Sequence, residues 1–456
     1  FSSVNSMASN QARLTSGPVG NHLVKMTVPV FFGVFAMMLQ GFVDAFFIGM
    51  LGDRELAALS FAFPILMIVT SVAIGLGAGT SSVVARAIGA NKVERAARLA
   101  TDSLLLSFLI TAAFCFVGIL SIDFLFTALG APSDMIPLIK EYMQVLYVGV
   151  PFVVVGMVGM SSMRATGDTR LPSLLMIIAS IANIILDPIM IFGLGPIPAM
   201  GLKGAAMAAL IARGAIFLGT IYLMHERINM LSFRVPKFDE LRSSWGDILH
   251  VGIPAAGTNA IIPVATAVIT AMLAQYGTEA VAGFGVASRI ESLVLVMFYA
   301  LSAVIGPFIG QNLSAAKAER IHSALRLCSR FCLLSGIGMA VFLLCFSEFL
   351  PSLFSKNPTV TETARLFLLI APISYGAYGI VMVMNASFNG MGKPGPAVVI
   401  SVARMIIMYL PLAYLLRYFY GISGIFMAYA IANIFSAVIA YKWANNSVQG
   451  QIEKMS

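Results

Sequence analysis

The amino-acid sequence predicts an all-α integral membrane protein, with twelve transmembrane helices in two pseudo-symmetric six-helix lobes. Its composition, the length of its apolar segments and an internal duplication support this prediction. Of the 456 residues, 59% are hydrophobic and only 11% are charged, with a mean hydropathy of +0.92. A soluble domain carries roughly a quarter charged residues. Water therefore cannot be the main solvent of this chain.

The apolar segments are long enough to cross a membrane as helices. Each has about 20 residues or more, which spans roughly 30 Å of hydrocarbon at 1.5 Å per residue. Strands are excluded because alternation at period two is absent, and each spanning segment must satisfy its own backbone groups. We predict helices over 24–51, 56–88, 100–127, 137–162, 172–196, 202–225, 247–275, 281–310, 324–350, 361–388, 396–418 and 421–443.

The distribution of Lys and Arg over the loops predicts the orientation. An even number of spans places both termini on one side of the membrane. The loops on that side carry many more basic residues, among them Lys92, Arg95 and Lys237, than the opposite loops, which include Arg54 and Lys356. By the positive-inside rule both termini are cytoplasmic. We expect a multi-pass protein of the bacterial inner membrane.

This arrangement predicts the division of the chain into segments. They are a polar N-terminal segment (1–22), an N-lobe (23–225), a cytoplasmic linker (226–246), a C-lobe (247–445) and a C-terminal tail (446–456). We expect no cleavable signal peptide, since the first 22 residues are polar and the following apolar run is too long. Because the chain begins at Phe1 rather than Met, we expect residues foreign to the natural protein among residues 1–9.

The two halves of the chain repeat one another at an offset of about 225 residues. Pro29 falls on Pro254, Gly52 on Gly277 and Gly167 on Gly392, and Lys92-x-Glu94-Arg95 falls on Lys317-x-Glu319-Arg320. With a five-residue slip, Gly201-x-x-Gly204 meets Gly421-x-x-Gly424. Each half holds an even number of spans, so the halves share one topology. A central cleft between two such lobes is typical of rocking transport.

Two carboxylates lie inside predicted helices of the N-lobe. Asp44 is about seven residues from the outer end of its helix and Asp187 about nine, so they lie at similar depth. An acid in the membrane costs at least about 2.5 kcal/mol on insertion scales and is seldom kept for packing. The alternative is that these acids only hold helices together through hydrogen bonds.

Each acid continues a polar stripe at helical spacing. The stripes are Asp44, Gln40, Met37 and Gly33 on one helix, and Asp187, Asn183, Ser180 and Met176 on the other. If they face each other, Asp44, Asp187, Asn183 and Gln40 form a proton-binding or cation-binding pocket, beside a substrate wall of Met37, Met176 and Ser180. Pro29 and Pro188 are candidate hinges.

Other unusual residues receive a structural interpretation. Arg213, Arg289, Glu291 and Arg404 also lie in spans, and Arg289 and Glu291 do not face each other, so any partner lies on another helix. Cys328 and Cys332 have no acidic or His co-ligand nearby, so we expect no metal. The four His residues are scattered and no phosphate-binding loop motif is present, which argues against an enzyme and against ATP use. The formal charge of +8 is explained by orientation and requires no nucleic acid.

Several short motifs resemble those of the multidrug and toxic compound extrusion (MATE) transporters. They are VDAFFIGMLG around Asp44, NIILDPIMIF around Asp187, the turn RATGDTR and the helix entry GLKGAAMAALIA. The resemblance runs over nearly the whole chain. It implies a MATE-like fold and a monomeric antiporter, surrounded by membrane lipids, that exchanges a cation for small organic, often cationic, drugs.

The resemblance also points to one branch of the family. Asp44 and Asp187, with Asn183 beside them, match the amino-terminal acids of its DinF-like branch. The NorM-like branch has acids in helices 7 and 10, yet residues 251–275 and 366–391 contain none. We therefore expect the proton rather than sodium as coupling ion, and no cofactor. A sodium-coupled antiporter and a flippase for lipids or lipid-linked saccharides remain alternatives.

Overall fold

A computed structural model describes residues 12–456, and these are almost entirely helical. Among them, twelve segments are long and apolar enough to cross a membrane. The predicted all-α membrane class with twelve spans is confirmed. The prediction about residues 1–9 lies outside the described part of the chain.

The chain folds into two compact units. Val28–Gly252 make up most of one unit, named the N-lobe below, while Leu14–Thr27 and Ile253–Ser456 form the other, the C-lobe. Both boundaries fall inside helices, next to Pro29 and Pro254, which are equivalent in the repeat. The segment predicted as a linker, 226–246, belongs to the N-lobe unit.

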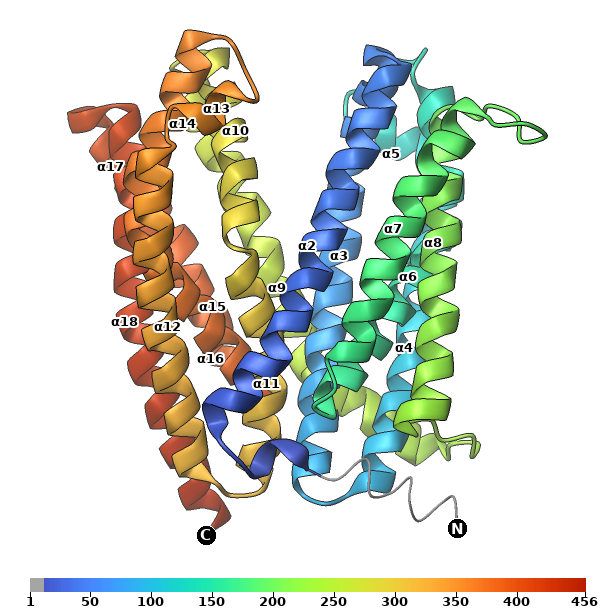
Figure 1. Cartoon of the computed structure of the whole chain (residues 1–456), viewed down its shortest axis with the longest axis vertical. Coiled ribbons are helices and arrows are strands. Elements are labelled where there is room, and N and C mark those ends of the chain that lie inside the picture. Colours follow the sequence, from blue (N-terminus) through green and yellow to red (C-terminus); the bar gives the residue numbers. More distant parts are fainter. Residues whose placement is uncertain (1–11) are drawn as a thin grey trace. The chain divides into compact units, whose positions relative to one another are not determined.

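The N-lobe contains six spanning helices (Figure 1). They are α2 (Val19–Leu51), α3 (Asp53–Gly89), α4 (Val93–Leu120), α6 (Ile136–Ala165), α7 (Arg170–Phe192) and α8 (Leu202–Leu223). The short α5 (Ile122–Ala128) and a π-helical turn, η2 (Met224–Ile228), complete it, and α9 (Phe238–Ala274) begins in this unit.

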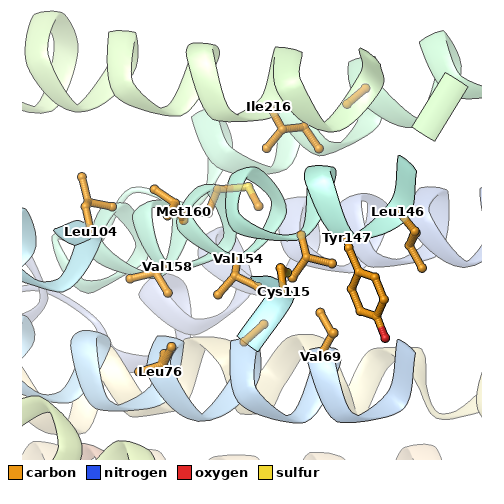
Figure 2. Close-up of a cluster of buried hydrophobic side chains, with 14 of the residues drawn as sticks. Val69, Leu76, Leu104, Cys115, Leu146, Tyr147, Val154, Val158, Met160 and Ile216 are labelled. Atoms are coloured by element: carbon orange, nitrogen blue, oxygen red, sulfur yellow. The ribbon is translucent and has the colours of Figure 1, made fainter. Parts of the chain in front are cut away.

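The core of the N-lobe surrounds α6. Figure 2 shows Val69 of α3, Cys115 of α4 and Ile216 of α8 close to α6 residues such as Val154 and Met160. Small residues on α6 permit this close packing: a Cβ at Gly156 would lie 3.2 Å from a methyl carbon of Ile216. Because lipid tails are as apolar as these side chains, shape complementarity rather than the hydrophobic effect holds such helices together.

The C-lobe contains the equivalent six spans, several of them in two or three pieces. After η1 (Arg13–Thr15) and most of α9 come α10 (Thr278–Val294), α11 (Val296–Ser314), α12 (Ala318–Cys345), α13 (Phe349–Ser352), α14 (Pro358–Ile370), η3 (Ala371–Ser374), α15 (Tyr375–Gly390), α16 (Gly395–Val402), η4 (Ala403–Tyr409), α17 (Leu410–Tyr420) and α18 (Ile422–Met455).

Three predicted helices of the C-lobe are interrupted within the span. The predicted helices 100–127 and 324–350 also end early, because α4 and α12 stop at Leu120 and Cys345 and the short α5 and α13 follow. The predicted helix 281–310 is interrupted at Leu295, whose ψ is 1°. The predicted helix 361–388 contains the 3-10 turn η3, which includes Pro372. The predicted helix 396–418 contains the π-helical segment η4, two residues before Pro411. Proline removes a backbone donor and displaces the preceding turn, which explains the last two.

The duplication is visible in the backbone of the turns. Gly52 and Gly277 have φ of 141° and 111°, and Gly167 and Gly392 have 97° and 77°. A side chain would be strained at these angles. Even the non-glycine turns agree, since Asn91 and its equivalent, Ala316, have φ of 61° and 55°. The repeat predicted from sequence is therefore a repeat of backbone geometry.

In each lobe, an equivalent arginine binds residues before or within the first turns of the first helix of the opposite half of the sequence. In the N-lobe, Arg95 donates to Ser244 Oγ at 3.1 Å and to Asp247 Oδ2 at 3.5 Å, both in α9. In the C-lobe, Arg320 donates to the carbonyl oxygens of Leu14 at 2.7 Å and Gly17 at 2.5 Å. These hydrogen bonds explain why the first residues of α2 and α9 belong to units other than the rest of their helices.

Candidate functional site

Helices α2 and α7 of the N-lobe contact each other near both ends of the two polar stripes. At the lower end, a Cβ placed on Gly33 would lie 3.3 Å from Met176 Sδ, so Met176 fills the space that glycine leaves. At the upper end, the rings of Phe47 and Phe192 pack edge to face with centroids 6.4 Å apart. Both helices are odd-numbered spans, so they run in the same direction.

These two contacts place the acids at one level. Asp44 lies eleven residues beyond Gly33, and Asp187 lies eleven residues beyond Met176. At 1.5 Å per residue each acid is roughly 16 Å above the lower contact. The equal spacing from the lower contact agrees with a shared depth of the two acids, while the facing of the full stripes stays a prediction.

Several buried polar atoms of these two stripes lack hydrogen-bond partners within the described residues. Asp187 and Asn183 are fully buried, and both oxygens of Asp187 and both amide atoms of Asn183 are unpartnered. Asp44 Oδ1 and Ser180 Oγ are unpartnered too. A buried unsatisfied polar group costs about 1–3 kcal/mol. Six such atoms on neighbouring turns of these two helices mark a candidate ligand site.

Three further side chains surround Asp44. Gln40, one turn earlier on α2, lies within hydrogen-bonding reach of the Asp44 carboxylate. Arg213 of α8 is near enough to act on it electrostatically, and Tyr142 of α6 lies close to both Asp44 and Arg213. Sequence reasoning interpreted Arg213 as structural and did not single out Tyr142. The signal for Tyr142 is weak, because a tyrosine in an apolar helix is ordinary.

The arrangement can bind a small cation. Carboxylate and amide oxygens accept hydrogen bonds or coordinate hard ions, and a proton on either carboxylate would become a donor to the remaining oxygens. Two adjacent acids titrate as a pair rather than singly. No group of three or more His, Cys, Asp or Glu side chains capable of holding a metal occurs in residues 12–456.

The remaining predicted site residues lie on the same two helices. Met176 and Ser180 are buried, and Met176 lies against Gly33 of α2, whereas Met37 is half-buried against the lobe core. Contact of Met176 with a cargo would require α2 to move away from α7 at Gly33. Helix α2 continues through Pro29, next to the unit boundary, and α7 continues through Pro188.

Comparisons with known proteins identify the family. The family model MatE matches residues 29–189 and, a second time, residues 254–415, so each half of the chain carries one copy. The chain belongs to the MatE family. Members of this family are transporters rather than enzymes, and the fold is that of a MATE transporter.

The names of relatives of this MATE transporter refer to different transported compounds. An FAD transporter of Shewanella oneidensis is 39% identical over 428 residues, covering 94% of this chain and 95% of that protein. The multidrug export protein MepA of Staphylococcus aureus is 23% identical, covering 93% of each chain. The crystal structure of the Vibrio cholerae MATE transporter VcmN, in its bent form, superposes with a TM-score of 0.89 at 32% identity, covering 98% of this chain and 99% of that one.

Proposed function

We propose that this MATE transporter is a secondary active exporter that exchanges a cation, the proton, for small organic compounds. The observation that carries the proposal is the level of unpartnered polar atoms between α2 and α7, where Asp44, Asp187 and Asn183 lie. Buried polar groups are retained at such cost mainly where a ligand binds them. The same residues support its placement in the DinF-like branch.

Proton coupling accounts for these residues with the fewest assumptions. Burial disfavours a charged carboxylate, and two carboxylates at one level disfavour each other's charge, so the pair gains from binding a proton. Sodium would need several oxygen ligands around it at once. Asp44, Asp187 and Asn183 could supply oxygens to sodium, which makes sodium the alternative coupling ion.

Export then follows from reciprocal coupling between proton and cargo. If protonation weakens cargo binding, cargo binding weakens protonation by the same factor. A proton arriving from outside neutralises the Asp44 and Asp187 level, and α2 repacks around Pro29. The space beside Met37 and Met176 becomes too small for the cargo, which leaves on the outer side.

Two classes of cargo are proposed. The family as a whole favours organic cations, in keeping with relatives named as multidrug export proteins. The name of the Shewanella oneidensis relative favours a flavin dinucleotide, which is anionic and much larger. That relative is 39% identical over nearly the whole chain, so FAD is the first compound to test.

The location and assembly are proposed on the same basis. The protein works as a monomer in the bacterial inner membrane, with both termini in the cytoplasm and lipids around its apolar helices. The excess of Lys and Arg on one set of loops supports this orientation.

Transport into proteoliposomes of the purified protein tests the proposal. One set of vesicles carries only a pH gradient in sodium-free buffer, and a second carries only a sodium gradient at equal pH. Each receives either FAD or the organic cation ethidium. We expect uptake of at least one compound under the pH gradient. Uptake that requires sodium and does not respond to the pH gradient would show that the proton is not the coupling ion. If neither gradient drives uptake of either compound, the proposed cargoes are rejected.

A further inference from the structure

The three interruptions in the C-lobe helices gather around one group of polar side chains. Glu291 lies one turn before the break at Leu295, Tyr375 directly follows the 3-10 turn η3, and Arg404 is the second residue of the π-helical η4. Their equivalents in the N-lobe run as continuous helices. Irregular backbone at membrane depth is costly, and π-helical turns and broken helices are frequent at functional sites. The coincidence therefore indicates a second site.

Glu291 is held by hydroxyl groups from two other helices. Tyr375 Oη of α15 donates to one carboxylate oxygen at 2.8 Å, and Tyr429 Oη of α18 donates to the other at 3.1 Å. Glu291 thus joins α10 to α15 and α18. It lies well inside α10, thirteen residues after the first residue of that helix, Thr278.

Arg404 is close to Glu291 and yet forms no ion pair with it. Its electrostatic influence reaches Glu291, but its Nη1 donates to Asn433 Oδ1 at 3.0 Å and its guanidinium stacks on Tyr378 at 4.6 Å. Arg404 is 3% exposed, and its Nε is unpartnered. Asn433 in turn donates to Ser374 of η3 at 3.1 Å. The polar network therefore runs through all three irregular segments or their neighbours.

A purely structural pair would be built differently. A buried Glu and Arg that only hold helices together gain most from a direct bidentate contact. Here the carboxylate is bound instead by hydroxyls, which can reverse from donor to acceptor. Glu291 can therefore gain or lose a proton while both tyrosines remain hydrogen-bonded. We propose that Glu291 is a second proton-binding site of this transporter, and that its protonation adjusts the interrupted helices of the C-lobe.

Five tyrosines and one arginine are the titratable or charged side chains that act on Glu291 from the surrounding elements. They are Tyr375 and Tyr378 of α15, Tyr429 of α18, Tyr299 of α11, and Arg404 and Tyr409 of η4. On the neighbouring α14, Glu362 and Arg365 pair with each other, and Arg365 also pairs with Glu348. Arg404 is the one cation in this set that acts on Glu291, and it is fixed by Asn433 and Tyr378.

A proton fits this site better than a metal ion does. The cluster offers a single carboxylate among hydroxyl groups, whereas hard metal ions take six or more oxygens, usually several carboxylates. Glu291 belongs to the C-lobe, whereas Asp44 and Asp187 belong to the N-lobe. The proposal goes beyond the coupling mechanism proposed for the N-lobe and does not depend on its details.

Proton uptake by the purified transporter in lipid nanodiscs tests the proposal. In weakly buffered solution, the protons bound between alkaline and acid pH are counted for the wild type, for Glu291→Gln, and for the matched control Glu279→Gln on the same helix. We expect Glu291→Gln to bind about one proton fewer than the wild type. Glu279 lies at the exposed start of α10, where it accepts a hydrogen bond from Asn357. Protons bound by buried acids are read separately, from the infrared carbonyl signal of protonated carboxylic acids that are protected from rapid hydrogen exchange. Glu279→Gln should leave this signal unchanged.

A second measurement leaves Glu291 in place, in case Glu291→Gln does not fold. In the Asp44→Asn, Asp187→Asn double variant, the infrared signal of a protonated, protected acid should persist. It should shift in frequency when Tyr429→Phe is added, because one hydrogen bond to the carboxyl group is lost. The proposal is overturned if the double variant shows no such signal, or if Glu291→Gln binds as many protons as the wild type. Failure of the N-lobe mechanism would appear separately, as transport that survives Asp44→Asn.

Discussion

The two lobes share a scaffold but use it for different chemistry. The N-lobe has continuous spanning helices and two acids, Asp44 and Asp187, with buried carboxylate oxygens that lack hydrogen-bond partners in the described residues. The C-lobe has three interrupted spans and an acid, Glu291, with both oxygens bound by tyrosine hydroxyls. Turn angles agree between the lobes at Gly52 and Gly277, where no chemistry is required.

This difference shows what a duplicated membrane protein preserves and what it changes. Turn geometry and close helix crossings are preserved because every six-helix lobe needs them. Polar groups inside the lobe have no such role and can diverge. An unpartnered acid is ready for a ligand, whereas a hydroxyl-bound acid already has its bonds and responds to protons by rearranging them.

Removing the titratable groups of the N-lobe should have the largest effect. We expect Asp44→Asn, and likewise Asp187→Asn, to reduce coupled export to the level of empty vesicles. Asparagine keeps the size and hydrogen bonding of aspartate but binds no proton in this range. Export is measured in proteoliposomes, with thermal unfolding as the check on folding. Full drug resistance in cells that contain Asp44→Asn at normal levels would contradict the assignment.

Single cysteines test whether both lobes have the predicted orientation. Cysteines at Asp53 in the N-lobe and Lys356 in the C-lobe should react with a membrane-impermeant thiol reagent from outside intact cells. Cysteines at Lys92 and Lys237 should not react until the cells are opened. The native cysteines are first replaced to remove background, and the reverse labelling pattern would overturn the orientation.

The shared scaffold predicts equal sensitivity at two equivalent glycines. A Cβ at Gly204 would collide with the carbonyl of Met190, and one at Gly424 with that of Leu416. Each Gly→Ala substitution should destabilise its lobe by about 1–3 kcal/mol, since backbone must move. Thermal unfolding in detergent measures the effect.

Matched controls lie on the same two helices. Gly214→Ala on α8 and Gly450→Ala on α18 meet nothing within 4 Å, so they should be neutral or stabilise by up to about 1 kcal/mol. If Gly204→Ala and Gly214→Ala change the unfolding temperature equally, then α8 at Gly204 is farther from the backbone of α7 at Met190 than in this structure.

The two equivalent arginines should contribute unequally to stability, and Arg95 should have the smaller effect. Arg320 donates to the backbone carbonyls of Leu14 and Gly17 through short hydrogen bonds, whereas Arg95 makes longer bonds to the buried hydroxyl of Ser244 and the exposed carboxylate of Asp247. Arg320→Ala should therefore cost about 2 kcal/mol. Arg95→Ala should cost less than about 1 kcal/mol. Equal shifts of the unfolding temperature would show that the two contacts are equivalent in strength as well as in position.

The sequence alone determined the fold class, the repeat and the two acid stripes. Apolar segments of spanning length, matching motifs such as Lys92-x-Glu94-Arg95 and Lys317-x-Glu319-Arg320, and the spacing of Asp187, Asn183 and Ser180 are properties of neighbouring residues along one chain. Helical periodicity converts such spacing into a face, so no tertiary contact is needed to read it.

Only the tertiary structure decided which faces meet and where helices break. That Gly33 packs on Met176, that Tyr142 and Arg213 surround Asp44, and that Glu291 is bound by Tyr375 and Tyr429 all depend on contacts between distant segments. The interruption at Leu295 has no proline or glycine near it in the sequence. Periodicity gives the direction of a side chain from its own helix, but its partner is set by how the helices pack, which is a property of the whole lobe.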